Sequence, residues 1–437
     1  MKKAKADKSR VLVVATTGDY IAHLHKAFSG QLLFVTDKEE RAHWPKNPPG
    51  AKDEILCSLE DPDRVLAAVF DHINKYRMSL NGITCFDCES MWLTAYLAGS
   101  LSLPFHSTDT IERVRSKFHS KDLWWQGGVG CPAAGLVRTK EDLIKFWQKA
   151  KADVVVKPLT GSGSEHVYRC KDKASCEKAF DILRDKLPNH PNRRMFVSER
   201  LPDGVNPGTV FCAESYVGGQ EFSCDAIFSE GHMRIVRVTR KIPLPSAEFG
   251  AIMAYQMLSA FPLQFTERDL MVTLKAAAVR LGFYSAWFMA DFKVDNGKIY
   301  LLEITPRPGG DCLPPLIKAA SGLDVFEVML DFARGRRVTV PPVSSYRPLA
   351  GVLLYAGKAG VIKKTGLKAV KARKEVVAAV LNRKKGDIVR LPPEDFDSRR
   401  LGYVIFEPDK GAAVDRQCKA IADEVVVEIE ESVHGKR

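Results

Sequence analysis

The sequence predicts a protein of mixed α/β and α+β class, with an open parallel-sheet domain, a larger α+β domain and a small α+β unit. Three observations support this prediction. Apolar strand segments alternate with helical segments over residues 1–108, glycine-rich turns join β segments within residues 109–337, and short strands and helices mix in residues 338–437. We expect these three ranges to be the domains, with PPVSSYRP (341–348) as the linker before the last one.

The spacing of apolar residues defines the N-terminal elements. The expected parallel strands are VLVVATT (11–17), QLLFVTD (31–37) and GITCFD (82–87). The expected helices cover residues 21–28, 63–76 and the segment from Glu89 to the turn after Gly99. Because strands and helices alternate, we expect a parallel sheet.

Residues 109–337 differ from this pattern and contain several β segments. A helix is expected from Thr110, and another helix ends near Gly335. The expected β segments are 135–139, 153–170, 196–201, 210–217, 221–242 and 287–305. The stretch VDNGK (294–298) is a strong signal for a tight antiparallel hairpin.

The composition is that of a globular chain without a membrane span. Apolar residues make up 45% of the 437 positions, which suffices for two to three packed domains. No apolar run approaches the roughly 18 residues that a membrane-spanning helix needs. The basic start MKKAKADKSR precedes only the short apolar run VLVVA, so we expect a tail rather than a signal peptide. The expected location is the cytoplasm.

The net charge of +12 suits polyanionic partners. Residues 358–385 contain ten Lys and Arg without interleaved aromatics, so we expect a solvated face there, with a nucleic-acid patch as the alternative. Among ten cysteines, only Cys85 and Cys88 form a C-x-x-C pair, and no second pair accompanies it. Ordinary reduced thiols are the expectation, and a redox motif stays open.

The stretch DVVVKPLTGSGSEHV (153–167) has the features of a phosphate-binding loop. An apolar strand ends in Lys157, and the small residues Gly161, Ser162, Gly163 and Ser164 follow. The glycines let backbone N–H groups turn toward one point, and Lys157 adds positive charge, which suits a flexible loop over polyphosphate. It is not a Walker loop, because G-x-x-x-x-G-K-[ST] is absent. The alternative is a plain β-hairpin with a glycine-rich turn.

In ESYVGGQEF (214–222), Glu214 and Glu221 bracket a Gly-Gly turn. Such a hinge offers backbone hydrogen bonds to an adenine edge, and Glu221 can accept from two ribose hydroxyls. Two solvated glutamates at an ordinary turn are the alternative.

Two carboxylates lie at the ends of apolar strands in MADFKVDNGKIYLLEITPRPGG (289–310). Antiparallel pairing across the VDNGK turn brings Asp291 close to Glu303. Two inward carboxylates repel each other unless a cation lies between them, and hard carboxylate oxygens favour Mg²⁺ held jointly with substrate phosphates. The alternative is an ion pair between Glu303 and Arg307 without a metal.

These motifs, in this order over about residues 109–335, resemble the ATP-grasp superfamily. In RSKFHSKDLWWQGGVGCP (115–132), Lys117 matches the family's first nucleotide-binding lysine, and Lys121 lies one turn further along the helix. The flanking regions are similar to those of the carboxylate–amine ligase branch, which includes the L-amino acid and dipeptide ligases. The middle region is thus expected to be an ATP-grasp domain.

The resemblance implies a ligase that transfers the γ-phosphate of ATP to a substrate carboxylate and joins the resulting acyl-phosphate to an amine. The implied nucleotide-binding residues are Lys117, Lys157, Gly161, Ser162, Gly163, Ser164, Glu214, Tyr216, Val217 and Glu221. The implied ligands of Mg²⁺, or of Mn²⁺, are Asp291, Glu303 and Thr305. The implied catalytic cations are Arg307 and either Arg240 or Lys241.

One departure from the family concerns Thr305, which stands where the family usually has Asn. A hydroxyl is a weaker magnesium ligand than an amide carbonyl, although a P-loop Ser/Thr serves in this way. A non-catalytic nucleotide-binding regulator therefore stays open, and among enzymes an ATP-dependent carboxylase is the alternative. Small carboxylates and amines are the expected partners, in a pocket near Glu89, Ser90 and residues 248–256. No membrane or nucleic-acid partner is expected, and a homodimer would fit this branch.

Overall fold

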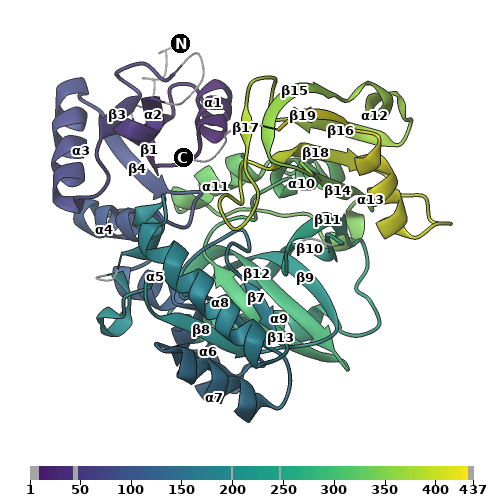
Figure 1. Cartoon of the computed structure of the whole chain (residues 1–437). Coiled ribbons are helices and arrows are strands. Elements are labelled where there is room, and N and C mark those ends of the chain that lie inside the picture. The colour runs from purple at the N-terminus through teal and green to yellow at the C-terminus, as the bar shows by residue number, and fades with distance from the viewer. Residues whose placement is uncertain (1–8, 43–47, 198–199, 246–247, 432–437) are drawn as a thin grey trace.

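The N-terminal part of the chain is a four-stranded parallel sheet in the order β3-β2-β1-β4 (Figure 1). The computed structural model describes residues 9–42, 48–197, 200–245 and 248–431. The strands are β1 (Ser9–Val14), β2 (Leu32–Asp37), β3 (Glu54–Cys57) and β4 (Ser79–Thr84). The helices are α1 (Gly18–Ala27), α2 (Lys38–Ala42), α3 (Pro62–Tyr76) and α4 (Met91–Leu101). The predicted open parallel sheet is confirmed, whereas the short strand β3 carried no clear alternation and was not expected.

Helix α3 shows how the sequence sets the ends of these elements. The side chain of Asp61 accepts hydrogen bonds from the backbone N–H groups of Asp63 and Arg64, and Pro62 occupies the first turn. A cap of this kind satisfies N–H groups that have no partner within the helix. The helix ends at Arg77, which adopts a left-handed conformation with φ 50°.

A second, antiparallel sheet has the strand order β5-β8-β6-β7. Its strands are β5 (Ala134–Val137), β6 (Val154–Pro158), β7 (Tyr168–Cys170) and β8 (Phe211–Ser215). The helices of this part of the chain are α5 (Thr108–Arg115), α6 (Lys117–Gln126), α7 (Lys140–Ala150) and α8 (Lys173–Lys186), with 3-10 turns at Leu187–Asn189, Arg193–Phe196 and Pro202–Gly204. The strand expected over 196–201 is wrong for the described residues of that range, which form no strand.

The largest sheet has eight strands in the order β13-β12-β9-β10-β11-β14-β18-β16. Its first part is β9 (Gln220–Ser229), β10 (His232–Pro243), β11 (Ile252–Met257), β12 (Ser285–Asp295) and β13 (Lys298–Thr305). Helix α9 (Glu267–Leu281) packs on it through buried leucines and alanines. The predicted VDNGK hairpin is confirmed, because Asp295 pairs with Lys298 across Asn296 (φ 48°) and Gly297 (φ 74°).

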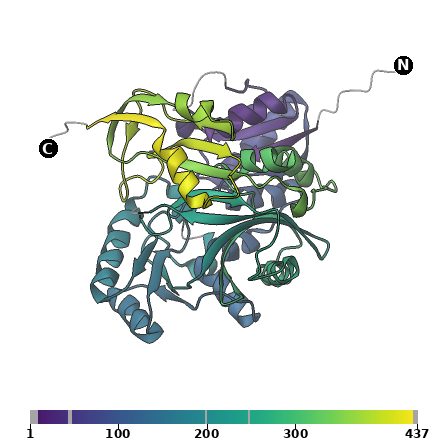
Figure 2. The same ribbon diagram turned by 90° about the vertical axis from the view of Figure 1, so that its right-hand side faces the viewer.

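The C-terminal part of the chain continues this same sheet. Strands β14 (Ala350–Tyr355), β16 (Val376–Leu381) and β18 (Arg400–Phe406) extend it beyond β11. A smaller sheet is built from β15 (Gly360–Gly366), β17 (Ile388–Val389) and β19 (Val426–Glu430). The accompanying helices are α12 (Lys368–Ala372) and α13 (Val414–Asp423), and a 3-10 turn lies at Val343–Ser345. Figure 2 shows these yellow elements beside the purple N-terminal domain, both above the teal middle region.

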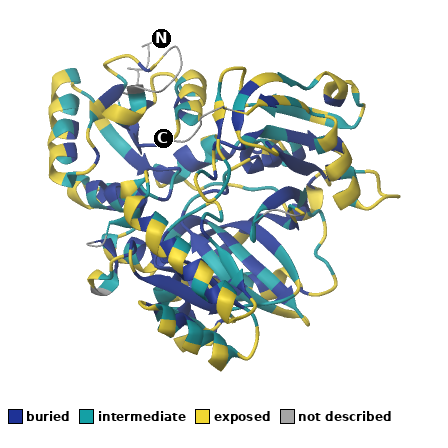
Figure 3. Cartoon of the chain, viewed as in Figure 1, coloured by how far each residue is buried: buried dark blue, intermediate teal, exposed yellow. Residues whose placement is uncertain are grey.

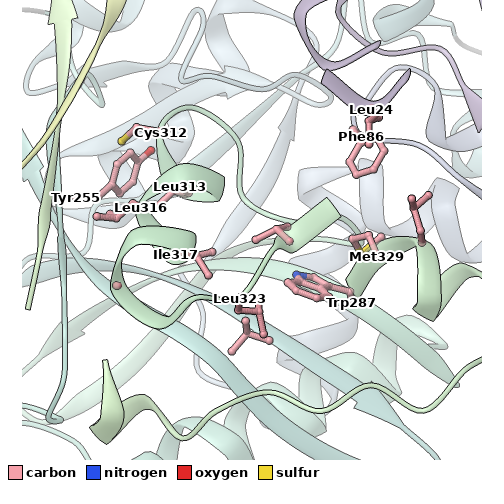
Figure 4. Close-up of a cluster of buried hydrophobic side chains, with 14 of the residues drawn as sticks. Leu24, Phe86, Tyr255, Trp287, Cys312, Leu313, Leu316, Ile317, Leu323 and Met329 are labelled. Carbon is pink, nitrogen blue, oxygen red and sulfur yellow. The ribbon is translucent and has the colours of Figure 1, made fainter. Parts of the chain in front are cut away.

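An apolar core joins the three regions. Helices α10 (Leu313–Ser321) and α11 (Val325–Ala333) lie between the N-terminal domain and the large sheet. Figure 4 shows their side chains with Phe86 from the N-terminal domain and Trp287 from β12 in one cluster. In Figure 3 the sheets are largely dark blue and the outer helix faces are yellow.

Among the described helices, none is long and apolar enough to cross a membrane. The division at 108 and 337 stays a prediction, since the eight-stranded sheet crosses the second boundary.

A buried ion pair ties β9 and β10 to the turn after β13. Arg237 Nε and Nη2 each lie 3.3 Å from a carboxylate oxygen of Asp225, and both side chains are fully buried. Asp225 also accepts the backbone N–H of Gly309 at 3.0 Å. Burial raises the pKa of Asp225 despite the neighbouring guanidinium. The pair therefore holds the glycine turn 309–310 against the sheet.

We expect Arg237→Met to lower the free energy of unfolding by about 3–5 kcal/mol, because it leaves the Asp225 carboxylate buried without its cation. Urea unfolding followed by circular dichroism measures this loss. The double variant Asp225→Asn/Arg237→Met keeps an acceptor for Gly309 and should recover most of the stability. A double variant as unstable as the single one would contradict this account.

Candidate active site

A large cleft, about 2180 Å³ in volume, lies where the three regions meet. Its walls come from the carboxyl ends of β1 and β4, the loop between β6 and β7, the hinge after β8, the facing ends of β12 and β13, and the start of β18. Ligands of open α/β sheets bind outside the carboxyl ends of the strands. The cleft is therefore the candidate site for the predicted chemistry.

The glycine-rich loop 161–164 connects β6 to β7, which pair antiparallel, and it lines the cleft. The hairpin considered as the alternative is therefore present, and its turn is the predicted loop. Gly161, Gly163 and Ser164 have φ values of 139°, 66° and 61°. Lys117, at the start of α6, donates from Nζ to the carbonyl oxygen of Gly161 at 3.1 Å. One predicted phosphate-binding lysine is thus in contact with the loop, and phosphate binding itself stays a prediction.

The carboxylate of Glu214 lies between two lysines. It is 2.7 Å from Lys121 Nζ and 2.8 Å from Lys157 Nζ, and all three side chains are nearly inaccessible to solvent. Burial alone would raise the pKa of Glu214, but the two ammonium groups bring it below its usual value. The resemblance made Glu214 a nucleotide-binding residue, whereas the structure directs its carboxylate to the two lysines. Glu214 thereby positions Lys157 at the cleft wall and holds Lys121 behind it.

The hinge after β8 is fixed by two cations that sequence reasoning missed. Arg169 stacks 3.7 Å from the centre of the Tyr216 ring, and Lys293 Nζ lies 4.7 Å from the same centre. Lys293 also donates to the carbonyl oxygen of Val217 at 2.8 Å. At Gly219 (φ 74°) a Cβ atom would lie 2.0 Å from the carbonyl oxygen of Val294, so the close approach of hinge and β12 requires glycine.

Asp291 and Glu303 are directly opposite each other on β12 and β13. Opposite residues of an antiparallel pair share a face, so the two side chains project from the same face of the sheet, as predicted. Glu303 Oε2 is 3.3 Å from Lys117 Nζ, and Asp291 Oδ2 is 2.9 Å from Lys241 Nζ. The alternative ion pair between Glu303 and Arg307 is wrong, because lysines provide the opposite charge.

These residues fit a magnesium ion shared with phosphate. Asp291 Oδ1 is buried and has no hydrogen-bond partner among the described residues. Thr305, which is 5% exposed, donates its hydroxyl to Glu303 Oε1 at 3.3 Å. The described residues contain no group of three or more His, Cys, Asp or Glu side chains suited to a metal. Two carboxylates completed by substrate phosphates are the usual way in which proteins bind Mg²⁺.

The structure separates the two cations that the sequence left as alternatives on β10. Successive side chains of a strand point to opposite faces. Lys241 faces the cleft and also pairs with Glu221 at 2.5 Å. Arg240 instead lies 2.5 Å from Asp415 and donates to Gln256 at 2.8 Å, outside the cleft lining. The prediction of Arg240 as a catalytic cation is therefore wrong, and the catalytic role of Lys241 stays a prediction.

Arg307 lines the cleft and is held by the N-terminal domain. Its Nε and Nη2 atoms lie 3.4 and 3.3 Å from Cys88 Sγ, and its Nη1 atom donates to the carbonyl oxygen of Pro308 at 2.7 Å. Cys85 and Cys88 are both free, buried thiols. Burial raises the pKa of Cys88, so the sulfur meets Arg307 mainly as a neutral thiol. No local pattern predicts a contact between residues 219 positions apart.

Acidic side chains follow β4 at the N-terminal end of the cleft. Burial, together with the charge of Glu89, raises the pKa of Asp87 to about 7. Glu89 lines the cleft as expected and accepts from Asn192 at 2.8 Å. Ser90 does not line the cleft, since its hydroxyl is buried and accepts from Arg194 at 2.9 Å. Most of the expected segment 248–256 lines the cleft as well.

Because of Asp87, we expect the free energy of unfolding to fall as pH rises from 4 to 7. The folded protein keeps the Asp87 proton up to about pH 7, whereas the unfolded chain releases it near pH 4. We expect Asp87→Asn to become increasingly more stable than the wild type between pH 4 and 7. The gain should reach at most about 4 kcal/mol, since one pKa unit corresponds to about 1.4 kcal/mol.

Urea unfolding at a series of pH values measures this difference. Asp71→Asn, a change at an exposed aspartate of α3 outside the cleft lining, is the matched control and should follow the wild type. A constant difference between Asp87→Asn and wild type across this range would contradict the raised pKa.

Comparisons with known proteins agree with this geometry. The ATP-grasp domain family matches residues 150–315, and the family described as L-amino acid ligase C-terminal domain 2 matches residues 352–430. A D-alanine–D-alanine ligase B from Chromobacterium violaceum is 27% identical over 214 residues, and the match covers 47% of this chain. The match spans 62% of that relative's own length, which is less than two thirds.

Solved structures share the fold at low sequence identity. The L-amino acid ligase from Bacillus licheniformis superposes with a TM-score of 0.74 at 18% identity, covering 98% of this chain and 100% of that one. Biotin carboxylase from Campylobacter jejuni gives a TM-score of 0.63 at 15% identity, covering 97% and 92%. The predicted resemblance is confirmed: the chain carries an ATP-grasp domain followed by a C-terminal domain of the L-amino acid ligase type.

Proposed function

We propose that the protein is an ATP- and Mg²⁺-dependent, ADP-forming ligase that joins a carboxylate to an amine. The observation that carries this proposal is the cross-strand pair Asp291–Glu303, which faces the cleft between Lys117 and Lys241. Carboxylates and lysines so close together suit a bound metal–polyphosphate complex, because each ligand charge meets an opposite one. The matches to ligase families support the same reaction.

Lys117, Lys157 and the loop 161–164 would bind the phosphates of ATP. Both lysines are paired with carboxylates, Lys117 with Glu303 and Lys157 with Glu214. A triphosphate carries more charge than either carboxylate, so it can take over these donors while the carboxylates stay nearby. The backbone of the hinge at Tyr216 and Val217 would face the adenine, and Glu221 the ribose.

Asp291 and Glu303 would hold Mg²⁺, with Thr305 as an additional oxygen ligand. The ion would supply positive charge that neutralises the phosphate oxygens. Lys241 pairs with Asp291 and with Glu221, so it sets the orientation of both carboxylates. Mn²⁺ accepts the same oxygen ligands.

The chemistry then needs two displacements. A carboxylate oxygen of the substrate attacks the γ-phosphorus, and ADP leaves. The amine nitrogen attacks the acyl carbon, inorganic phosphate leaves, and the nitrogen loses a proton. Contacts with Cys88 and Pro308 take up three of the five guanidinium N–H groups of Arg307, so the others remain for the developing negative charge. The names of the two ligase relatives favour amino acids as substrates.

The ten free cysteines favour a reducing compartment such as the cytoplasm.

Phosphate release from MgATP tests the proposal. We expect wild-type protein to release phosphate only when amino-acid pools are present, and Glu303→Gln to lower the rate at least about 100-fold, because one carboxylate of the metal pair is removed. A coupled assay for phosphate and ADP measures this, with mass spectrometry for the amide product.

The matched control is Glu428→Gln, whose carboxylate pairs with Lys364 on the exposed face of the C-terminal sheet, and which should keep the wild-type rate. ATP binding without pool-dependent release would contradict ligase activity and favour a nucleotide-binding regulator. Release that requires bicarbonate but no amine would favour a carboxylase.

Thr305→Asn tests the departure from the family pattern. An amide carbonyl is a better magnesium ligand than a hydroxyl, so we expect half-maximal activity at a several-fold lower Mg²⁺ concentration. Titration of the rate with Mg²⁺ at fixed ATP measures the shift. A higher Mg²⁺ requirement, with unchanged unfolding midpoint, would show that Thr305 contributes through its hydrogen bond to Glu303 instead.

A further inference from the structure

One arginine of the C-terminal region reaches the glycine-rich loop. Arg400 is the first residue of β18, within the matched C-terminal domain family. Its Nη2 atom donates to the carbonyl oxygen of Gly163 at 3.3 Å. The loop 161–164 is thus contacted by cations at two carbonyl groups, by Lys117 at Gly161 and by Arg400 at Gly163.

The fit between Arg400 and the loop is close. A Cβ atom at Gly163 would lie 2.9 Å from Arg400 Nη2, and Gly163 has a φ of 66°. The conformation at this position therefore favours glycine, and a side chain there would displace the guanidinium of Arg400. On another side, Ser164 lies against Gly250, where a Cβ atom would be 3.3 Å from its hydroxyl oxygen. The loop is enclosed by segments from two parts of the chain.

The other side of the same guanidinium binds the turn after β13. Arg400 Nη1 is 2.9 Å from Asp311 Oδ1, and Asp311 Oδ2 accepts from the hydroxyl of Tyr255 at 3.1 Å. Asp311 adopts a left-handed backbone with φ 53°, and it lies four residues after Arg307. The planar guanidinium group of arginine can donate to two acceptors at once in a fixed geometry, which the ammonium group of lysine does less well.

We propose that Arg400 is a positioning residue that keeps the glycine-rich loop closed over the nucleotide by linking Gly163 to Asp311. The C-terminal region thereby couples the loop to the turn that carries Arg307. This proposal rests on the proposed nucleotide site and goes beyond it, because it assigns the C-terminal region a part in nucleotide binding. Arg400 need not touch the substrate, since it acts through the loop backbone.

Hydrogen–deuterium exchange of the full chain tests the contact without any turnover. We expect Arg400→Ala to increase deuterium uptake in peptides covering residues 159–168, both without nucleotide and with a non-hydrolysable ATP analogue. We expect the same variant to weaken analogue binding about tenfold in calorimetry, and to raise the KM for ATP more than it lowers kcat.

Arg373→Ala is the matched control. The Arg373 side chain is 30% exposed, against 31% for Arg400, and it pairs with Glu375 and Glu424 outside the cleft lining. This variant should leave loop exchange and nucleotide affinity at wild-type values. Arg400→Lys keeps the charge but not the fork, so its loop exchange should lie between the wild type and Arg400→Ala.

Unchanged loop exchange and unchanged affinity in Arg400→Ala would overturn the proposal. If Arg400→Ala unfolds, Arg400→Lys decides: wild-type exchange and affinity in that variant would likewise overturn it. A wild-type protein that binds no ATP analogue would count against the proposed function, whereas the exchange difference measured without nucleotide still tests the contact between Arg400 and Gly163.

Discussion

Buried lysines paired with carboxylates organise this cleft. An ammonium or carboxylate group taken out of water without a partner costs several kcal/mol, so the charges are stable here only together. Glu214 lies between Lys121 and Lys157, and Glu303 meets Lys117. Cations suited to a polyphosphate are therefore already oriented. When a polyphosphate binds, the lysines exchange a carboxylate partner for a phosphate without moving far. This limits the reorganisation that binding requires.

The large sheet extends this arrangement to the C-terminal region. Because β14, β18 and β16 continue the sheet beyond β11, the start of β18 lies at the cleft. Arg400 occupies this position and binds both Gly163 and Asp311. The residues of a glycine-rich loop provide little packing of their own. Such a loop therefore needs contacts with other parts of the chain to stay closed.

The N-terminal domain contributes to the same cleft through the carboxyl ends of its strands. Cys88 follows β4 and fixes the guanidinium of Arg307 from across the domain boundary. The apolar cluster around α10 and α11 also holds the two regions together. The contact between the N-terminal domain and the rest of the chain therefore provides hydrophobic packing and also orients Arg307. The acidic residues Asp87 and Glu89 line the same cleft.

The sequence by itself determined the features that depend on neighbouring residues. Strand alternation, the VDNGK turn and the opposition of Asp291 and Glu303 follow from periods and turn types within a few positions. Only the tertiary structure decided which cation meets which carboxylate. It directed Lys241 rather than Arg240 into the cleft, and it gave Glu214 to two lysines. Such contacts join distant parts of the chain, so packing and sheet order decide them, and local patterns carry no information about either.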